Sequence, residues 1–214
     1  MSFLKSLFTK SSDSAAAAVQ EPAALDPSYL LNAPEIVGWL STEEQHLLFD
    51  AMLLFYQDTD SVLDVGCGRA DLYGFLQSKS DIVNYKGIDL NSNLISLANV
   101  KYPTAAVESV DILSYNPDYT FDWVMGSGLF NLNDHPNMVE YAKECIDKMY
   151  RLSSKGVVFN LLTGIPADLP ESDANQLVVH NAGEWLNYLV EKYTKVYARA
   201  DYMSGDITFF IFNF

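Results

Sequence analysis

Short apolar segments alternate with amphipathic segments along most of the chain. The apolar runs are too short for helices and predict buried parallel strands. They lie at residues 62–65, 82–88, 105–110, 121–125 and 156–162. Between them apolar residues recur at helical spacing, most clearly in the stripe of Met138, Ala142, Cys145, Ile146, Met149 and Leu152. This alternation predicts a doubly wound α/β domain, with helices on both faces of a mostly parallel sheet.

The C-terminal part of the chain breaks this alternation. After a predicted helix over residues 184–192, aromatic strands at 193–202 and 206–214 flank a turn at Ser204-Gly205. Two strands joined by a short turn predict an antiparallel hairpin. We therefore expect one edge strand of the sheet to be antiparallel.

The segment before the first strand predicts a helix. Ser41 followed by Glu44 has the pattern of a capping box, which marks a helix start. The apolar face of this helix is expected to comprise Leu47, Leu48, Ala51, Leu54 and Phe55. The helix is expected to lie against the sheet.

The first 26 residues differ in composition from the rest. Phe3, Leu4, Leu7 and Phe8 fall at helical spacing, and serines, alanines and prolines follow them. We expect a flexible N-terminal tail over 1–26 and one domain over 27–214. The tail either docks on a protein partner through its apolar residues or is a frayed terminus, as is common for chain ends.

The first predicted strand runs into a glycine turn and then a helix. The stretch reads SVLDVGCGRADLYGFL, with the turn at Gly66-Cys67-Gly68. Glycines there allow a tight turn and a close approach of the backbone to a ligand. This arrangement is typical of a nucleotide-binding opening. Asp64, inside the strand, is expected either to meet a ligand ammonium group or to bond N–H groups of the loop.

Asp71 favours one class of nucleotide over another. A dinucleotide fingerprint has a third small residue where this chain has Asp71, and a carboxylate there repels a diphosphate with only Arg69 in the loop to compensate. S-adenosylmethionine carries no phosphate but has a sulfonium and an ammonium group. The sequence therefore favours S-adenosylmethionine and disfavours a nicotinamide oxidoreductase.

Four spaced motifs resemble those of class I S-adenosylmethionine-dependent methyltransferases. They are VLDVGCGRADL, YKGIDLN at residues 85–91, SVDIL at 109–113 and FDWVMGSGLFN at 121–131. More narrowly, GWLSTEEQ, SGLFN and DYMSGDIT resemble a small group of bacterial or phage methyltransferases of unassigned substrate.

The resemblance implies a Rossmann-like, seven-stranded, mostly parallel sheet with an antiparallel C-terminal hairpin, and S-adenosylmethionine as the cofactor. Asp89 is expected to hold the ribose hydroxyls, Asp111 to meet the adenine amino group and Ile112 to line the base. The full set of expected cofactor-binding residues is Asp64, Gly66, Cys67, Gly68, Asp89, Leu90, Asp111, Ile112 and Ser127.

The acceptor side carries a weaker signal. The fourth strand lacks the Asn/Asp-Pro-Pro-aromatic tetrad that holds amines in nucleobase and glutamine methyltransferases. Asn131 and His135 are the catalytic candidates there, with His135 either a general base or a solvated loop residue.

Three further residues are expected near the cofactor, and two histidines away from it. Tyr29, Trp39 and Gln45 either roof the cofactor pocket or belong to the core. His46 and His180 are expected at the surface or at helix caps, and the three scattered histidines give no metal set.

Composition narrows the partners and the compartment. The chain has 28 acidic and 13 basic residues and a net charge of −15, which disfavours nucleic acid and anionic membranes as partners. Two cysteines without a disulfide pattern indicate a reducing compartment, so we expect a cytoplasmic protein.

The function that we expect is S-adenosylmethionine-dependent methyl transfer to a small-molecule or protein acceptor. The alternative is a methyltransferase-like binding or assembly module without turnover, tethered to a complex by its N-terminal peptide.

Overall fold

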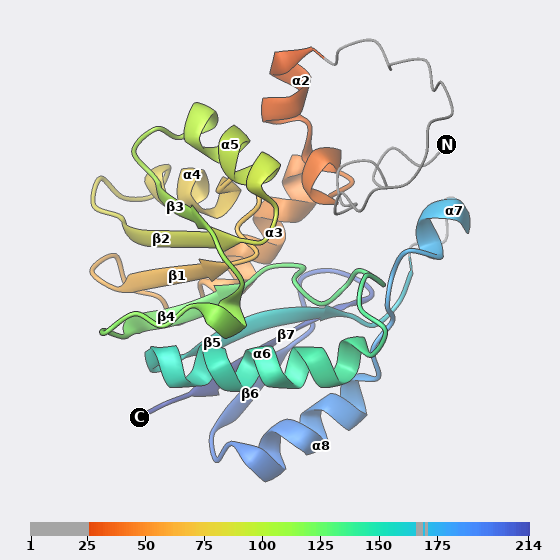
Figure 1. Ribbon diagram of the computed structural model, residues 1–214. Helices are drawn as coiled ribbons and strands as arrows, with labels where there is room; N and C mark the ends of the chain where they lie inside the picture. Colours follow the sequence, from red (N-terminus) through yellow and green to blue (C-terminus); the bar gives the residue numbers. More distant parts are fainter. Residues whose placement is uncertain (1–25, 166–168, 170) are drawn as a thin grey trace.

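The computed structural model describes residues 26–165, 169 and 171–214, so the predicted tail lies outside the described residues except for Asp26. Seven strands form one sheet in the order β3-β2-β1-β4-β5-β7-β6 (Figure 1). The strands are β1 (Ser61–Val65), β2 (Asn84–Asp89), β3 (Ala106–Ser109), β4 (Phe121–Gly126), β5 (Ser153–Leu162), β6 (Val196–Arg199) and β7 (Asp206–Phe212). This is the predicted α/β sheet.

The helices connect these strands in alternation along the chain. They are α2 (Pro27–Asn32), α3 (Thr42–Met52), α4 (Asp71–Gln77), α5 (Ser92–Lys101), α6 (Met138–Leu152), α7 (Glu171–Ala174) and α8 (Ala182–Lys192), with short 3-10 helices η1 (Pro34–Val37) and η2 (Ile112–Ser114). Local caps begin several of them. The Ser41 hydroxyl accepts a hydrogen bond from the Glu44 N–H at 3.1 Å, as the capping box predicts. No helix within the described residues is both long and apolar enough to cross a bilayer.

The expectation of an antiparallel edge strand is wrong in one respect. β7 is the antiparallel strand, but it lies between β5 and β6, and β6 forms the edge. The reason is burial: Phe209, Phe210 and Ile211 of β7 are fully buried, so this strand needs neighbours at both edges. β6 has four residues, and its Tyr197 is 42% exposed, which suits an edge.

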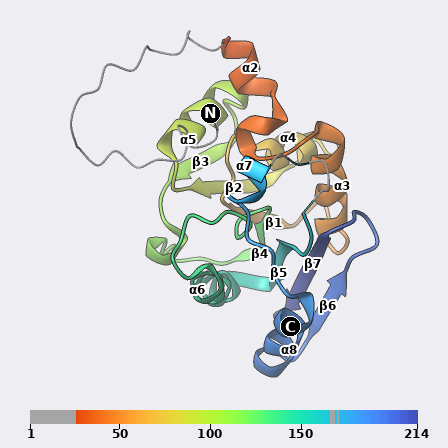
Figure 2. The ribbon, with the colours of Figure 1, turned by 90° about the vertical axis from the view of Figure 1, so that its right-hand side faces the viewer.

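Each face of the sheet packs against its own helices. α6 and α8 cover one face and α3 and α4 the other, so α3 and α6 lie on opposite sides of the sheet (Figure 2). The predicted α6 stripe is buried throughout. The predicted face of α3 is partly wrong: Leu47, Leu54 and Phe55 are 48%, 44% and 40% exposed. The helix ends at Met52, before Leu54 and Phe55, because the chain must then turn back to enter β1. Phe49 and Met52 are buried against the sheet instead.

Candidate functional site

The glycine loop after β1 is tied to the end of the neighbouring strand. Gly66 and Gly68 have φ values of +73° and +54°, a left-handed conformation that favours glycine. The N–H groups of Gly66 and Cys67 both donate to the carbonyl of Ile88, at 2.8 and 3.0 Å. The N–H of Gly68 donates to Asp89 Oδ2 at 2.8 Å. The end of β2 therefore fixes the loop in place.

Asp89 stands at the carboxyl end of β2 with both oxygens engaged by backbone. Oδ2 binds the Gly68 N–H, and Oδ1 accepts from the Asn91 N–H at 2.7 Å. Burial raises the pKa of Asp89, and the two N–H donors oppose that rise. Each carboxylate oxygen has a second lone pair, so Asp89 keeps the capacity to accept from ligand hydroxyls.

Three other expected cofactor residues lie beside Asp89. Leu90 is 56% exposed and follows it directly. The N–H of Val110 donates to the Asp89 carbonyl at 3.0 Å, which brings the end of β3 alongside. There Asp111 caps η2 by accepting from the Leu113 N–H at 2.9 Å, and Ile112 is buried. The structure thus groups Asp89, Leu90, Asp111 and Ile112 at one end of the sheet.

A buried acid lies beneath the glycine loop. Asp64 accepts a hydrogen bond from the Tyr85 hydroxyl at 2.7 Å, and burial raises the pKa of Asp64 to about 7. Burial also raises the pKa of the Cys67 thiol, so this cysteine stays protonated and is no nucleophile. The Asp64 side chain is therefore bound by a tyrosine and not by an N–H group of the loop.

Asp71 is neutralised by two cations: Arg69, the cation expected within the loop, and Lys101, which lies outside the loop in α5. Asp71 pairs with Arg69 at 3.0 Å and with Lys101 of α5 at 2.6 Å. Arg69 is 1% exposed and also donates to the Leu30 carbonyl of α2 at 2.8 Å. Asp71 therefore repels a diphosphate less than the sequence indicated. The missing third small residue still separates this loop from the dinucleotide fingerprint.

The loops after β1 and β4 face each other across one pocket. Gly66, Gly68 and Ser127 line it, and Trp39 and Gln45 close it from the α3 side. A Cβ on Gly66 would come within 2.7 Å of the Leu129 side chain, and one on Gly68 within 3.0 Å of Val37. These contacts leave no room for a side chain at either glycine.

The wall of this pocket holds an orphan polar atom, the Ser127 hydroxyl. Its oxygen is buried and has no hydrogen-bond partner among the described residues. An unsatisfied buried hydroxyl is costly, and such groups concentrate where a ligand supplies the missing partner. Of the three expected roofing residues, Trp39 and Gln45 line the pocket, whereas Tyr29 is 41% exposed and does not.

The two catalytic candidates lie near this pocket but not in its lining. Asn131 Oδ1 accepts from the Leu162 N–H at 2.9 Å, which ties the loop after β4 to the end of β5. His135 accepts from the Asn137 N–H at 3.3 Å through Nδ1, and its ring stacks on Tyr141 at 4.6 Å. Both side chains therefore have structural bonds, and their acceptor-side roles stay predictions.

The expectation for His180 is wrong, because it is buried. Its Nδ1 accepts from the Trp185 indole N–H at 3.1 Å, so its Nε2 carries the proton and donates to the Phe130 carbonyl at 2.9 Å. Burial lowers the pKa of His180, which keeps it neutral. No local sequence signal marks this bond, because its partners are 50 residues apart.

Comparison with known proteins agrees with this geometry. Residues 62–156, from β1 into β5, match the family model described as a methyltransferase domain. Over this segment, which is less than half of the chain, the sequence is similar to a methyltransferase domain. A protein of Mycobacterium tuberculosis that is named as a methyltransferase is 27% identical over 109 residues. That match covers 50% of this chain and 65% of the relative, so it spans less than two thirds of the relative's length.

Solved structures of methyltransferases share the fold of this chain. The magnesium protoporphyrin IX methyltransferase of Synechocystis, crystallised with S-adenosylhomocysteine, superposes with a TM-score of 0.62 at 11% identity, over 87% of this chain and 96% of that one. An amino pentose methyltransferase of Micromonospora echinaspora with bound S-adenosylmethionine gives 0.61 at 14% identity, over 92% and 100%. The N-methyltransferase NodS of Bradyrhizobium japonicum gives 0.55 at 16%, over 80% and 95%.

Proposed function

We propose that this domain binds S-adenosylmethionine and transfers its methyl group to a small-molecule or protein acceptor. The observation that carries the proposal is the Ser127 hydroxyl, buried without a partner in a pocket shared with Gly66 and Gly68. A ligand with polar groups close to the backbone would satisfy this hydroxyl. The bound cofactor supplies a methyl group that is already activated for displacement.

The described residues fit the two ends of this cofactor. Asp89 offers free lone pairs for ribose hydroxyls, and Asp111 and Ile112 stand at the next strand end for the adenine. Gly66, Gly68 and Ser127 line one pocket, and we assign the methionine part of the cofactor to it. Asp64 also lines this pocket, and its carboxylate form suits a positive sulfonium or ammonium group, whereas Asp71 is already paired with Arg69 and Lys101.

The residues of the domain contribute mainly alignment and exclusion of water. A displacement at an activated carbon gains most from holding the reacting atoms in line at contact distance. Trp39, Phe49 and Leu72 give the pocket an apolar wall on the side of α3 and α4. An apolar wall excludes water and strengthens the electrostatic interactions inside. Cys67 stays protonated, so we assign it to the cofactor loop without a covalent role.

The acceptor is proposed to enter beside the loop of residues 127–135. Asn131 and His135 are the acceptor-side candidates, with Asn131 holding the loop and His135 available as a base. The net charge of −15 favours a neutral or cationic small molecule or a protein side chain over an anionic polymer. Known proteins of this fold differ in what they methylate, from a porphyrin to an amino pentose.

Transfer of a labelled methyl group tests the proposal. The wild-type protein is incubated with methyl-labelled S-adenosylmethionine and a cell extract, which is then separated into protein and small-molecule fractions. We expect label in one fraction and none with the Asp89→Ala variant. Binding of S-adenosylhomocysteine without any transfer would instead favour the binding module without turnover. Absence of both binding and transfer would overturn the proposal.

A further inference from the structure

A buried polar network stands behind the Ser127 turn, at the end of the sheet that carries the site. Asn160 of β5 is fully buried, and its Oδ1 accepts from the Gly128 N–H at 2.7 Å. Its Nδ2 donates to Asp206 Oδ2 of β7 at 2.7 Å. Asp206 is 4% exposed and also accepts from the Tyr202 hydroxyl. The network therefore runs from the first residue of β7 to the backbone of the pocket turn.

The donors and acceptors of this network can be arranged in one way only while Asp206 is ionised. A carboxylate only accepts hydrogen bonds, so Asn160 must present its NH₂ to Asp206. The amide oxygen of Asn160 then faces the Gly128 N–H. Since the Tyr202 hydroxyl gives its proton to Asp206, the Thr208 hydroxyl donates to Tyr202 at 2.8 Å. The charge of Asp206 thus sets the orientation of the group that holds the turn.

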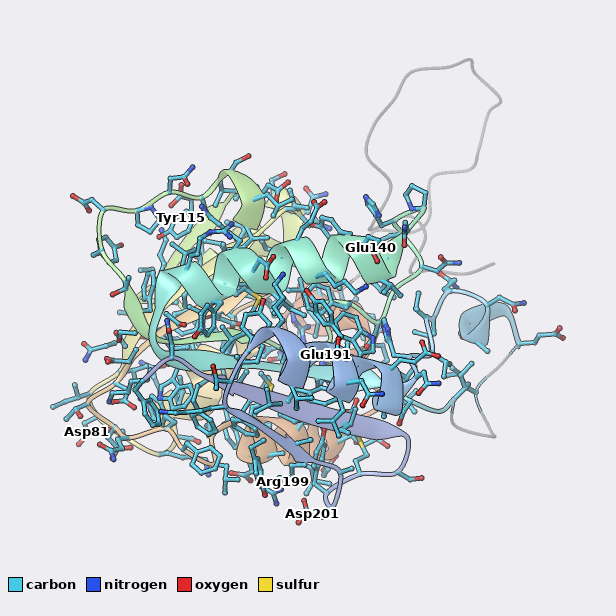
Figure 3. All side chains as sticks on the ribbon, turned by 90° about the horizontal axis from the view of Figure 1, so that it is seen from below. Asp81, Tyr115, Glu140, Glu191, Arg199 and Asp201 are labelled. Atoms are coloured by element: carbon cyan, nitrogen blue, oxygen red, sulfur yellow. The ribbon has the colours of Figure 1, made fainter. Side chains whose placement is uncertain are left out.

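The cation over the Tyr202 ring, Arg199, pairs with another acid. The Arg199 guanidinium lies 5.9 Å from the centre of the Tyr202 ring, but its Nε pairs with Asp201 at 2.6 Å on the surface (Figure 3). None of the ion pairs between described residues includes Asp206. A buried carboxylate without a cationic partner costs free energy. Such a cost is retained at positions where the charge serves the site.

We propose that Asn160 and Asp206 are positioning residues that hold the Ser127-Gly128 turn in the form that binds the cofactor. Gly128 has a φ of +68°, and Ser127 beside it presents the orphan hydroxyl of the pocket. Leu129, the next residue, packs over Gly66 of the facing loop. Release of the Gly128 N–H therefore displaces Ser127, which lines the pocket, and Leu129, which lies against Gly66 of that lining. This inference rests on the proposed function for its cofactor.

Protonation of Asp206 releases the turn. Burial raises the pKa of Asp206 to about 6, against the two hydrogen bonds from Tyr202 and Asn160. A neutral carboxyl group is a weaker acceptor than a carboxylate, so the hydrogen bonds from Asn160 and Tyr202 weaken. Asn160 is then held less firmly, and so is the Gly128 N–H that it accepts from. The cofactor is thus bound more weakly below about pH 6 than above it.

The test compares three variants with the wild type by calorimetry with S-adenosylhomocysteine and by NMR of the Gly128 amide. Asp206→Asn keeps the shape of the side chain and removes its charge. Asn160→Ala removes the oxygen that accepts from the Gly128 N–H. Asn213→Ala is the matched control, since Asn213 Nδ2 also bridges backbone carbonyls, those of Tyr150 and Ser153, at the other end of β7. Thermal melting of all three measures the structural cost.

We expect the Gly128 amide shift of the wild type to titrate with a midpoint near pH 6, and that of Asp206→Asn to be flat. At pH 7.5, both network variants weaken binding about tenfold, whereas Asn213→Ala lowers melting temperature without changing affinity. A Gly128 amide that does not titrate, or network variants with wild-type affinity, would overturn the inference. If the wild type binds no S-adenosylhomocysteine, the proposed function fails, and the amide titration still decides the network.

Discussion

The two halves of the sheet build their parts of the site in different ways. In the half formed by β1, β2 and β3, the contacts join neighbouring strand ends, as in the bond between Gly68 and Asp89, 21 residues apart. In the half formed by β4 to β7, the contacts also join neighbouring strands but over longer stretches of sequence: Gly128 to Asn160 over 32 residues and Asn160 to Asp206 over 46. The contacts of the first half span the shorter stretches of sequence. The second is assembled by tertiary packing, which leaves room for acceptor pockets to vary.

If this contrast is right, the largest loss of cofactor affinity should come from the glycine loop. Gly68→Ala places a Cβ 3.0 Å from Val37, another residue of the pocket lining, at a φ of +54°, so the loop or Val37 must shift. We expect S-adenosylhomocysteine affinity to fall about 100-fold. Gly38→Ala is the control, because Gly38 also has a positive φ, +85°, but its Cβ meets nothing within 4 Å. Equal losses of affinity in both variants would show that backbone strain at a positive φ, and not crowding of the pocket lining, causes the loss.

The second prediction concerns Asp64, in the first half of the sheet, and the pH dependence of the free energy of unfolding. The pKa of Asp64 is raised to about 7, so the folded protein binds this proton more tightly than the unfolded chain does. Stability from this group is full below the unfolded pKa of about 3.9 and is lost as pH rises toward 7. We expect Asp64→Asn, which keeps an acceptor for Tyr85, to gain about 1–3 kcal/mol of unfolding free energy at pH 8.

Denaturant unfolding at two pH values checks this expectation. The gain of Asp64→Asn should shrink toward zero at pH 4.5, where the wild-type carboxyl is protonated in the folded state. A variant that is destabilised equally at both pH values would contradict the buried, proton-binding carboxyl.

In the acceptor half, Asn131→Ala should act on stability and turnover but not on cofactor binding. It removes the acceptor of the Leu162 N–H, so we expect a loss of about 1 kcal/mol in unfolding free energy. Affinity for S-adenosylhomocysteine should stay within about twofold, and turnover on the acceptor should fall. A large loss of cofactor affinity would show that Asn131 contributes to cofactor binding, which contradicts its assignment to the acceptor side.

His135→Ala should have the smallest effect on the folded protein. It removes a stacked contact with Tyr141, for which we expect about 0.5 kcal/mol. If His135 is the general base, turnover falls by about 100-fold or more while melting and cofactor affinity are nearly unchanged. Wild-type turnover in this variant would leave His135 as a capping residue of the loop before α6.

The same contrast explains how far the sequence predicts the molecule. Asp89, the Ser41 cap and the glycine loop were predictable because each depends on residues a few positions away or on a fixed motif spacing. The place of β7 inside the sheet was not, because a hairpin pattern does not say which arm is buried on both sides. Burial of His180 and Asp206 was equally hidden, since each also binds a partner far along the chain, Phe130 and Asn160 respectively.

Calorimetric titration with S-adenosylhomocysteine tests the central claim most directly. The wild type should bind it and not NAD, and Asp89→Ala should bind it about 1.5–3 kcal/mol more weakly, roughly 10- to 150-fold. Asp122→Ala is the matched control, because Asp122 likewise accepts from a backbone N–H, that of Ser61 at 2.9 Å, but at the opposite end of the sheet. The account predicts unchanged affinity in that control. Binding of NAD in place of S-adenosylhomocysteine, or equal affinity in wild type and Asp89→Ala, would contradict it.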